Sequence, residues 1–138
     1  MIIRQARKSD CHAMAKVHVD TWQTTYQGIV EQEILDQLSY ESREKRWREL
    51  FEQENSEAVT FVAETEEGEL VGFINGGPER SNEYGYEGEL YSFYILKAYQ
   101  RQGIGSLLLK ELAITLAHNG FESMLVWVLE KKSVSCLL

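Results

Sequence analysis

Hydrophobic positions divide the N-terminal third of the 138-residue chain into a strand followed by helices. The apolar opening at residues 2–6 predicts a first strand, and Ser9 or Asp10 offers the N-cap of a helix over residues 10–24. Gly28 closes that segment. The inward stripe of this helix has helical spacing, at Met14, Ala15, His18 and Trp22. A second helical region, rich in Arg and Glu elsewhere, is marked by apolar and aromatic residues at Ile34, Leu35, Leu38, Tyr40, Trp47, Leu50 and Phe51.

The middle of the chain predicts a hairpin and a central strand. β-branched and aromatic residues fill positions 58–63, a second such run covers 70–74, and Gly68 lies in the turn between them. Residues 76–88 contain several glycines and the only proline of the chain, which favours a loop. This loop leads into residues 89–96, whose dense aromatic and aliphatic side chains predict a strand.

The last predicted elements are a helix and a strand. Apolar residues at helical spacing cover 104–117, and Asn119 followed by Gly120 is typical of a helix end. Residues 121–129 then predict one more strand. No internal repeat interrupts the order strand, helices, hairpin, strand, helix, strand, and 138 residues suffice for one core. The pattern predicts a single α/β or α+β domain.

Charge and composition narrow the classes of partner. The net charge of -8 repels nucleic-acid backbones and anionic membranes, so neither is expected as a partner. No apolar run is long enough to cross a bilayer and the N-terminus lacks a signal-peptide layout, which makes a cytosolic location the default expectation. Cys11 and Cys136 suggest neither a disulfide nor a zinc site, and the three histidines show no metal-ligand spacing, so no metal is expected.

The most informative motif lies between the central strand and the last helix, over residues 100–108. A helix N-terminus offers unpaired backbone N–H groups, and the glycines at 103 and 105 let an anion approach that backbone. The order strand, glycine turn, helix therefore favours phosphate binding. A dinucleotide-binding motif would need a third glycine at Leu108, and a Walker loop would need Gly-Lys-Ser/Thr, so both alternatives fail.

This order of elements, with Gln100-x-x-Gly103-x-Gly105 between strand and helix, resembles the GNAT superfamily of N-acetyltransferases over residues 1 to about 129. The resemblance implies a mixed, largely antiparallel sheet flanked by helices, and acetyl-CoA as co-substrate. It implies that Arg101 and the backbone from Gln102 through Ser106 bind the pyrophosphate of coenzyme A. It further implies that the open edge of the central strand pairs with the pantetheine arm. The implied coenzyme site comprises Phe93, Tyr94, Ile95, Gln100, Arg101, Gln102, Gly103, Ile104, Gly105 and Ser106.

Transfer of an acetyl group to an amine needs a group that accepts the ammonium proton. The family often places a carboxylate on the central strand, so Glu89 is the candidate base. The alternatives are an ordinary surface glutamate at this position, or Glu83 or Glu87 nearby as the base. Tyr91 is the second catalytic candidate, as a hydrogen-bond donor or a pocket wall, against the alternative of a core aromatic. Trp22 and Tyr26 are the candidates for substrate contacts, with core packing as the alternative for Trp22 and for His18 one turn before it.

The acceptor and the C-terminus are the least determined parts. Four glutamates at 79, 83, 87 and 89 make the loop acidic, which favours a small cationic amine as acceptor. Residues 130–138 lack the Asn and the Tyr that the family carries there, so we expect a domain truncated or altered after about 129, without its last helix and C-terminal strands. An open strand edge would then favour a homodimer. A catalytically weak or inactive acetyl-CoA-binding relative and a non-enzymatic interaction domain stay open as alternatives.

Overall fold

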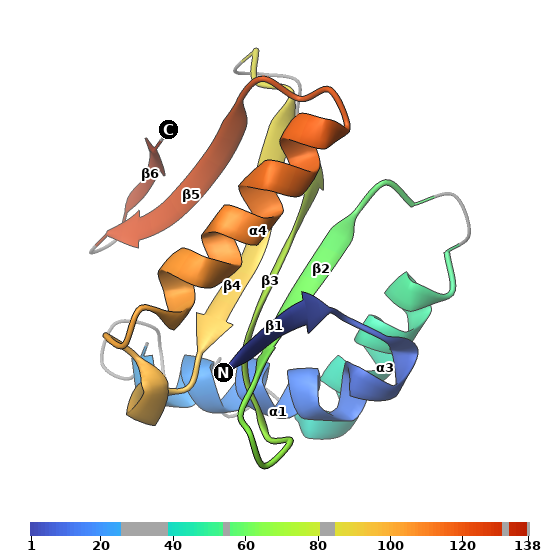
Figure 1. Cartoon of the computed structure of the whole chain (residues 1–138), viewed down its shortest axis with the longest axis vertical. Coiled ribbons are helices and arrows are strands. Elements are labelled where there is room, and N and C mark those ends of the chain that lie inside the picture. Colours follow the sequence, from blue (N-terminus) through green and yellow to red (C-terminus); the bar gives the residue numbers. More distant parts are fainter. Residues whose placement is uncertain (26–38, 54–55, 81–84, 131–132, 138) are drawn as a thin grey trace.

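A computed structural model describes residues 1–25, 39–53, 56–80, 85–130 and 133–137 of the chain. Six strands form one sheet in the order β1-β2-β3-β4-β5-β6 (Figure 1). All neighbouring strands are antiparallel except β4 and β5, which are parallel. This is the mixed, largely antiparallel sheet that the family resemblance implies. The strands are β1 Ile2–Gln5, β2 Val59–Glu64, β3 Leu70–Pro78, β4 Gly88–Ile95, β5 Met124–Glu130 and β6 Ser133–Leu137.

Helices cover both faces of the sheet, because the strands of its middle are apolar on both sides. Helices α1, Cys11–Thr25, and α3, Tyr40–Phe51, pack against the face that carries Phe73. Helix α4, Ile104–His118, packs against the opposite face, which carries Ile74 (Figure 1). The inward stripe of α4 is fully or almost fully buried at Ile104, Leu108, Leu112 and Leu116, as the helical spacing predicts.

The predicted loop over residues 76–88 is wrong at its start, because β3 continues to Pro78. The two glycines at this point allow side chains of α4 and β4 to pack close to the backbone of β3. A Cβ on Gly76 would lie 2.9 Å from a methyl carbon of Leu112, and one on Gly77 would lie 2.9 Å from the Tyr91 hydroxyl oxygen. Glycine in a strand often marks such a close approach, which composition alone does not separate from a loop.

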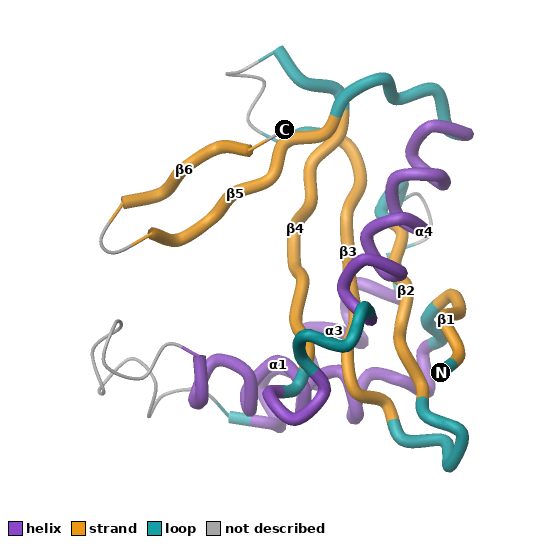
Figure 2. The backbone as a smooth tube through the Cα atoms, turned by 60° about the vertical axis from the view of Figure 1, so that its left-hand side comes forward, coloured by secondary structure: helices purple, strands orange, loops and turns teal. Residues whose placement is uncertain are grey.

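The structure adds a strand after the last one expected from the sequence. Residues 133–137 form β6, which pairs with β5 in an antiparallel register from Val126↔Leu137 to Glu130↔Ser133. The sequence analysis expects no further helix or strand beyond about residue 129, and the described part differs from this expectation by this one strand. Figure 2 shows β5 and β6 bending away from β4 as a pair.

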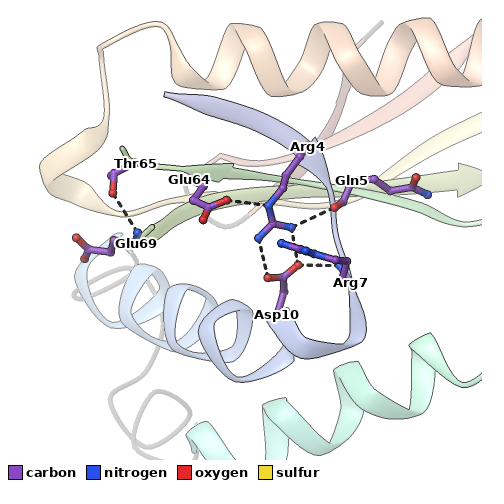
Figure 3. Close-up of polar contacts among 7 residues, drawn as sticks. All are labelled: Arg4, Gln5, Arg7, Asp10, Glu64, Thr65 and Glu69. Carbon is purple, nitrogen blue, oxygen red and sulfur yellow. Dashed lines mark hydrogen bonds and ion pairs between the residues drawn. The ribbon is translucent and has the colours of Figure 1, made fainter. Parts of the chain in front are cut away.

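A charged cluster fixes the start of α1 to the edge of the sheet (Figure 3). The guanidinium of Arg4 on β1 donates to both carboxylate oxygens of Asp10, at 2.8 and 2.9 Å, and to Glu64 on β2 at 2.8 Å. The backbone N–H of Arg7 also donates to Asp10, at 2.7 Å. These hydrogen bonds and the ion pair hold the pKa of Asp10 below its usual value. The carboxylate therefore joins β1 to the turn that begins the helix.

Candidate functional site

Strands β4 and β5 separate halfway along their length. Their parallel pairing covers only Gly88↔Met124, Glu89↔Leu125 and Leu90↔Val126. Beyond Leu90, β4 stays paired with β3 as far as Ile95, while no described strand lies on its other side. The backbone of this half of β4 is an open edge inside the sheet, visible in Figure 2 as the gap between β4 and the β5–β6 pair.

The glycine turn leads from this open edge into α4. Arg101 and Gly103 both have positive φ, at 63° and 84°, and α4 begins at Ile104. The N–H of Leu107 donates to the carbonyl of Gly103, so the N–H groups before it have no intrahelical acceptor. No acidic side chain occupies this first turn. The helix dipole and these free N–H groups make the turn suited to an anion.

Contacts of the turn hold it close to the open half of β4. The Gln100 side-chain amide donates to the carbonyl of Ile95 at 2.9 Å. A Cβ on Gly105 would lie 3.2 Å from side-chain carbons of both Phe93 and Ile95, so a larger residue would require these side chains to shift. The residues that the family resemblance implies for coenzyme binding are therefore neighbours in space. The carbonyl of Ile95, however, already has the Gln100 side chain as its partner.

Glu89 is a buried residue with its own counter-ion. Its side chain is 4% exposed, and it accepts hydrogen bonds from the backbone N–H, Nε and Nη2 of Arg80, at 3.0, 3.2 and 2.7 Å. The alternative of an ordinary surface glutamate is wrong, because Glu89 lies inside the protein. Glu89 in turn raises the pKa of the Arg80 guanidinium. Both carboxylate oxygens are thus occupied by a single arginine.

Tyr91 lies beside this pair at the point where β4 and β5 separate. Its hydroxyl donates to the carbonyl of Pro78 on β3, and the Arg80 guanidinium carbon lies 4.2 Å from the centre of its ring. Burial raises the pKa of the Tyr91 hydroxyl, against the opposing effect of Arg80. Tyr91 is therefore half-buried, protonated at neutral pH and linked to the same arginine as Glu89.

A cavity of about 590 Å³ opens between α3 and the β2–β4 face of the sheet. Its floor carries a row of polar residues in strand register, Thr60 opposite Asn75 and Asn75 opposite Ser92. The wall from α3 includes Arg43, Arg46, Trp47 and Leu50, and His18 of α1 reaches it as well. Tyr91 and Ser92 bring the cavity to the open half of β4. Local patterns do not predict this space, because residues far apart in sequence enclose it.

His18 joins the cavity to the aromatic core. Its ring stacks on Tyr94 at 4.5 Å between centroids and meets Trp47 and Phe73 at tilted angles. The core packing expected for His18 is thus what the structure has. Burial, together with the positive charges of Arg43 and Arg46, lowers the pKa of His18 to about 4. The imidazole is neutral at physiological pH.

The remaining predicted residues lie elsewhere or outside the description. Trp22 donates from Nε1 to the hydroxyl of Tyr94 at 2.9 Å and does not line the cavity in the described structure. Tyr26 lies outside the described residues. Of the four loop glutamates, Glu79 and Glu89 are buried, Glu87 is exposed and Glu83 is not described. None of the three described ones lines the cavity, and the one acidic residue among the described lining residues is Glu57.

Two further searches concern the described residues only. No group of three or more His, Cys, Asp or Glu side chains among them is arranged to hold a metal ion. None of their helices has the length and apolar character of a membrane span.

Comparison with known proteins gives consistent matches. The model of the acetyltransferase (GNAT) family matches residues 22–136. Over 129 residues, the chain is 43% identical to the uncharacterized N-acetyltransferase YuaI of Bacillus subtilis (strain 168), an alignment that covers 94% of this chain and 72% of that protein.

Solved structures share the fold. One is a PaiA N-acetyltransferase from Thermoplasma acidophilum in complex with coenzyme A, with a TM-score of 0.76 and 23% identity, covering 92% of this chain and 78% of that one. Another is a ribosomal-protein-alanine N-acetyltransferase from Brucella melitensis, with a TM-score of 0.70 and 28% identity. The match covers 93% of this chain and 74% of that one.

Proposed function

The chain belongs to the GNAT family of acetyltransferases, and from that premise we propose that it transfers the acetyl group of acetyl-CoA to the primary amine of a small acceptor. The observation that carries the proposal is the separation of β4 from β5 after Leu90, with a cavity alongside it. A thioester in that gap would lie between a helix N-terminus that suits phosphate and a cavity that suits an acceptor. Placing the two reactants in contact supplies much of the catalysis.

The coenzyme site is proposed at the glycine turn and the open edge of β4. The backbone N–H groups from Gln102 through Ser106 would bind the pyrophosphate, with Arg101 adding positive charge. The edge from Phe93 to Ile95 would pair with the pantetheine arm, and Gln100 would release the Ile95 carbonyl if that group is used. Acetyl-CoA itself supplies the activated acyl group as a thioester.

Glu89 is proposed to accept the proton of the acceptor's ammonium group, directly or through a water. The neutral amine nitrogen then forms a bond to the acyl carbon as the carbon–sulfur bond breaks. The nitrogen loses its excess proton to give the amide, and the leaving thiolate takes up a proton to give the free thiol of coenzyme A. Because Arg80 occupies both carboxylate oxygens, Glu89 can act only when the guanidinium releases one of them. Arg80 can swing away, since 63% of its side chain is exposed.

Tyr91 is proposed to position the acceptor or to donate a hydrogen bond near the reacting atoms. Its raised pKa keeps the hydroxyl protonated, and its contact with Arg80 couples it to Glu89. Trp22 and Tyr26 are retained as candidates for acceptor contacts from the helical side of the site. The acceptor's amine is cationic until it loses its proton, in line with the sequence analysis, but the acidic loop residues do not supply the described cavity wall.

The test is release of free thiol from acetyl-CoA over a panel of amines, alongside calorimetric titration with acetyl-CoA. We expect binding, thiol release that depends on the amine, and a loss of turnover in Glu89→Gln of about 10²-fold or more with the affinity for acetyl-CoA retained. Binding without amine-dependent thiol release would identify a non-catalytic relative instead. Absence of binding would contradict the proposed coenzyme site.

A homodimer through the C-terminal strand edge is part of the same proposal. β6 forms one edge of the sheet, so in the described structure the outer backbone groups of this strand have no strand partner. Such an edge can pair with a second copy of the chain. Light scattering at micromolar concentration tests this, and a well-folded monomer there would exclude the dimer.

A further inference from the structure

We infer that the acceptor carries an anionic group besides its amine, and that Arg43 and Arg46 of α3 bind this group at the cavity wall. The inference rests on the proposed function, because it names the chemical class of the acceptor for that same site. The observations behind it are the charged side chains that line the cavity and the ion pairs that these side chains do or do not form among the described residues.

The cavity wall is basic in an acidic protein. Among the described residues that line it, three are arginines, Arg43, Arg46 and Arg80, against the single carboxylate of Glu57, although the whole chain has 22 acidic and 14 basic residues. Arg80 is committed to Glu89. In the described part of the chain, Arg43 and Arg46 lie beyond 4.0 Å from every carboxylate oxygen, whereas their neighbour Arg48 pairs with Glu44. Among the described residues, the wall therefore offers two guanidinium groups that have no carboxylate partner.

The positive charges of these two arginines affect residues that line the cavity. They lie three residues apart on α3, on the face that also carries Trp47 and Leu50, two further cavity residues. Both lower the pKa of His18, a buried residue that lines the cavity from α1. Their positive potential thus reaches the space an acceptor would fill.

The opposite side of the cavity suits an amine. The Asn75 side-chain nitrogen donates to the Val59 carbonyl at 3.2 Å and to the Thr60 hydroxyl at 2.7 Å. Because a carbonyl can only accept, these bonds fix the orientation of the amide. The Asn75 side-chain oxygen is then left without a partner among the described residues. Asn75 stands beside Ser92 on β4, within the half of that strand that is open to the proposed thioester.

An acceptor with two ends matches this arrangement. Its amine would lie toward Asn75, Ser92 and the open edge of β4, and its anionic group toward the two arginines of α3. Planar guanidinium groups bind carboxylate and phosphate through paired, charge-assisted hydrogen bonds, so either anion fits the wall. The acceptor class is therefore an amino acid, an amino phosphate or a similar amine with one acidic group.

Matched amines test the inference in the thiol-release assay. Lysine is compared with 1,5-diaminopentane, which lacks the carboxylate, and phosphoethanolamine with ethanolamine. We expect kcat/KM to be at least about tenfold higher for the anionic member of one pair, through a lower KM. Equal kcat/KM values within both pairs, or a preference for the members without the acidic group, would overturn the inference while leaving the acetyltransferase proposal intact.

Variants assign the effect to the two arginines. Arg43→Gln combined with Arg46→Gln is expected to abolish the preference, and Arg43→Glu with Arg46→Glu to reverse it toward the diamine. Arg48→Gln, on the same helix but paired with Glu44 and outside the cavity lining, is the matched control and should keep the preference. A preference unchanged in both double variants would overturn the inference, and circular dichroism confirms that each variant is folded.

A binding measurement separates this inference from the proposed function. If no amine releases thiol, calorimetric titration can still measure binding at the wall formed by Arg43 and Arg46. The two ligands are N-acetylated lysine, which keeps the carboxylate, and the same compound with a carboxamide in its place. We expect the carboxylate form to bind at least about tenfold more tightly and to lose that advantage in the Arg43→Gln, Arg46→Gln variant. Equal binding of the two forms, or no binding of either, would overturn the inference independently of catalysis.

Discussion

The guanidinium of Arg80 closes over the carboxylate of Glu89, with 2.7 Å between Nη2 and Oε2 and 3.2 Å between Nε and Oε1. The two partners differ in their exposure, because 63% of the Arg80 side chain is exposed but only 4% of that of Glu89. The pair thus joins a buried anion on β4 to a cation at the protein surface. Removing the cation and removing the anion are therefore different perturbations.

The first prediction concerns this asymmetry. Arg80→Ala leaves a buried carboxylate without its counter-ion, so we expect the free energy of unfolding to fall by about 1–3 kcal/mol. Glu89→Gln removes the buried charge and lets the exposed guanidinium return to water, which should cost about 1 kcal/mol or less. Urea unfolding at neutral pH measures both. The prediction is wrong if Glu89→Gln proves the more destabilising change.

The second prediction concerns His18 and acid. Its pKa is about 4 in the folded protein against an ordinary value of 6.5, so the unfolded chain binds a proton that the native protein does not. This group's contribution to stability is present above about pH 6.5 and lost as the pH falls toward 4, up to roughly 3 kcal/mol. His18→Phe should lose less stability than the wild type over this interval.

Unfolding by urea at several pH values between about 7 and 4 provides the measurement for His18. His118→Gln is the control, since that histidine is exposed at the end of α4 and should leave the pH dependence unchanged. An equally steep loss of stability in His18→Phe would show that other groups cause the acid sensitivity.

Periodic patterns predicted the elements well, and spatial relations between distant residues poorly. The stripe Ile104, Leu108, Leu112 and Leu116 and the strand at residues 89–96 follow from spacing that a single element imposes on its own sequence. The end of β3 could not be predicted. Gly76 and Gly77 are glycines because Leu112 and Tyr91, which come from other elements, leave no room for a Cβ there.

The site divides in the same way. The turn around Gly103 was predicted because backbone conformation demands glycine locally. Arg43 and Arg46 were missed, since on a helix rich in Arg and Glu they resemble an ordinary solvated face. Only the packing of α3 over the sheet makes them part of a cavity wall. Asn75 gave the one available signal, as a polar residue directly after the apolar run of β3.

The third prediction concerns the carboxylate at the start of α1. Asp10→Asn removes the ionic character of the pair with Arg4, and we expect a loss of about 1–3 kcal/mol in the free energy of unfolding at neutral pH. Because the native pKa of Asp10 is lowered, its contribution is present above the ordinary value of 3.8 and lost as the pH falls through the native pKa. The difference between variant and wild type should therefore narrow in acid. Glu66→Gln, exposed in the hairpin turn, should show neither effect.

The fourth prediction uses the two glycines that flank α4. Gly103 and Gly120 have φ values of 84° and 92°, and a Cβ at either position would meet no atom within 4 Å. Substitution by alanine therefore imposes the same backbone strain without a clash, about 1–2 kcal/mol in each case. The two variants should have similar unfolding midpoints in urea. They differ in which end of the helix is strained.

Only the N-terminal substitution should affect the coenzyme. The proposed pyrophosphate site uses the backbone N–H groups from Gln102 through Ser106, and strain at Gly103 changes the direction of these groups, whereas Gly120 lies at the far end of the helix. We expect Gly103→Ala to weaken binding of acetyl-CoA by roughly tenfold in calorimetric titration, and Gly120→Ala to leave it unchanged. Since stability falls equally in both, a selective loss in Gly103→Ala cannot come from partial unfolding. Equal affinities in the two variants would show that the turn only caps the helix.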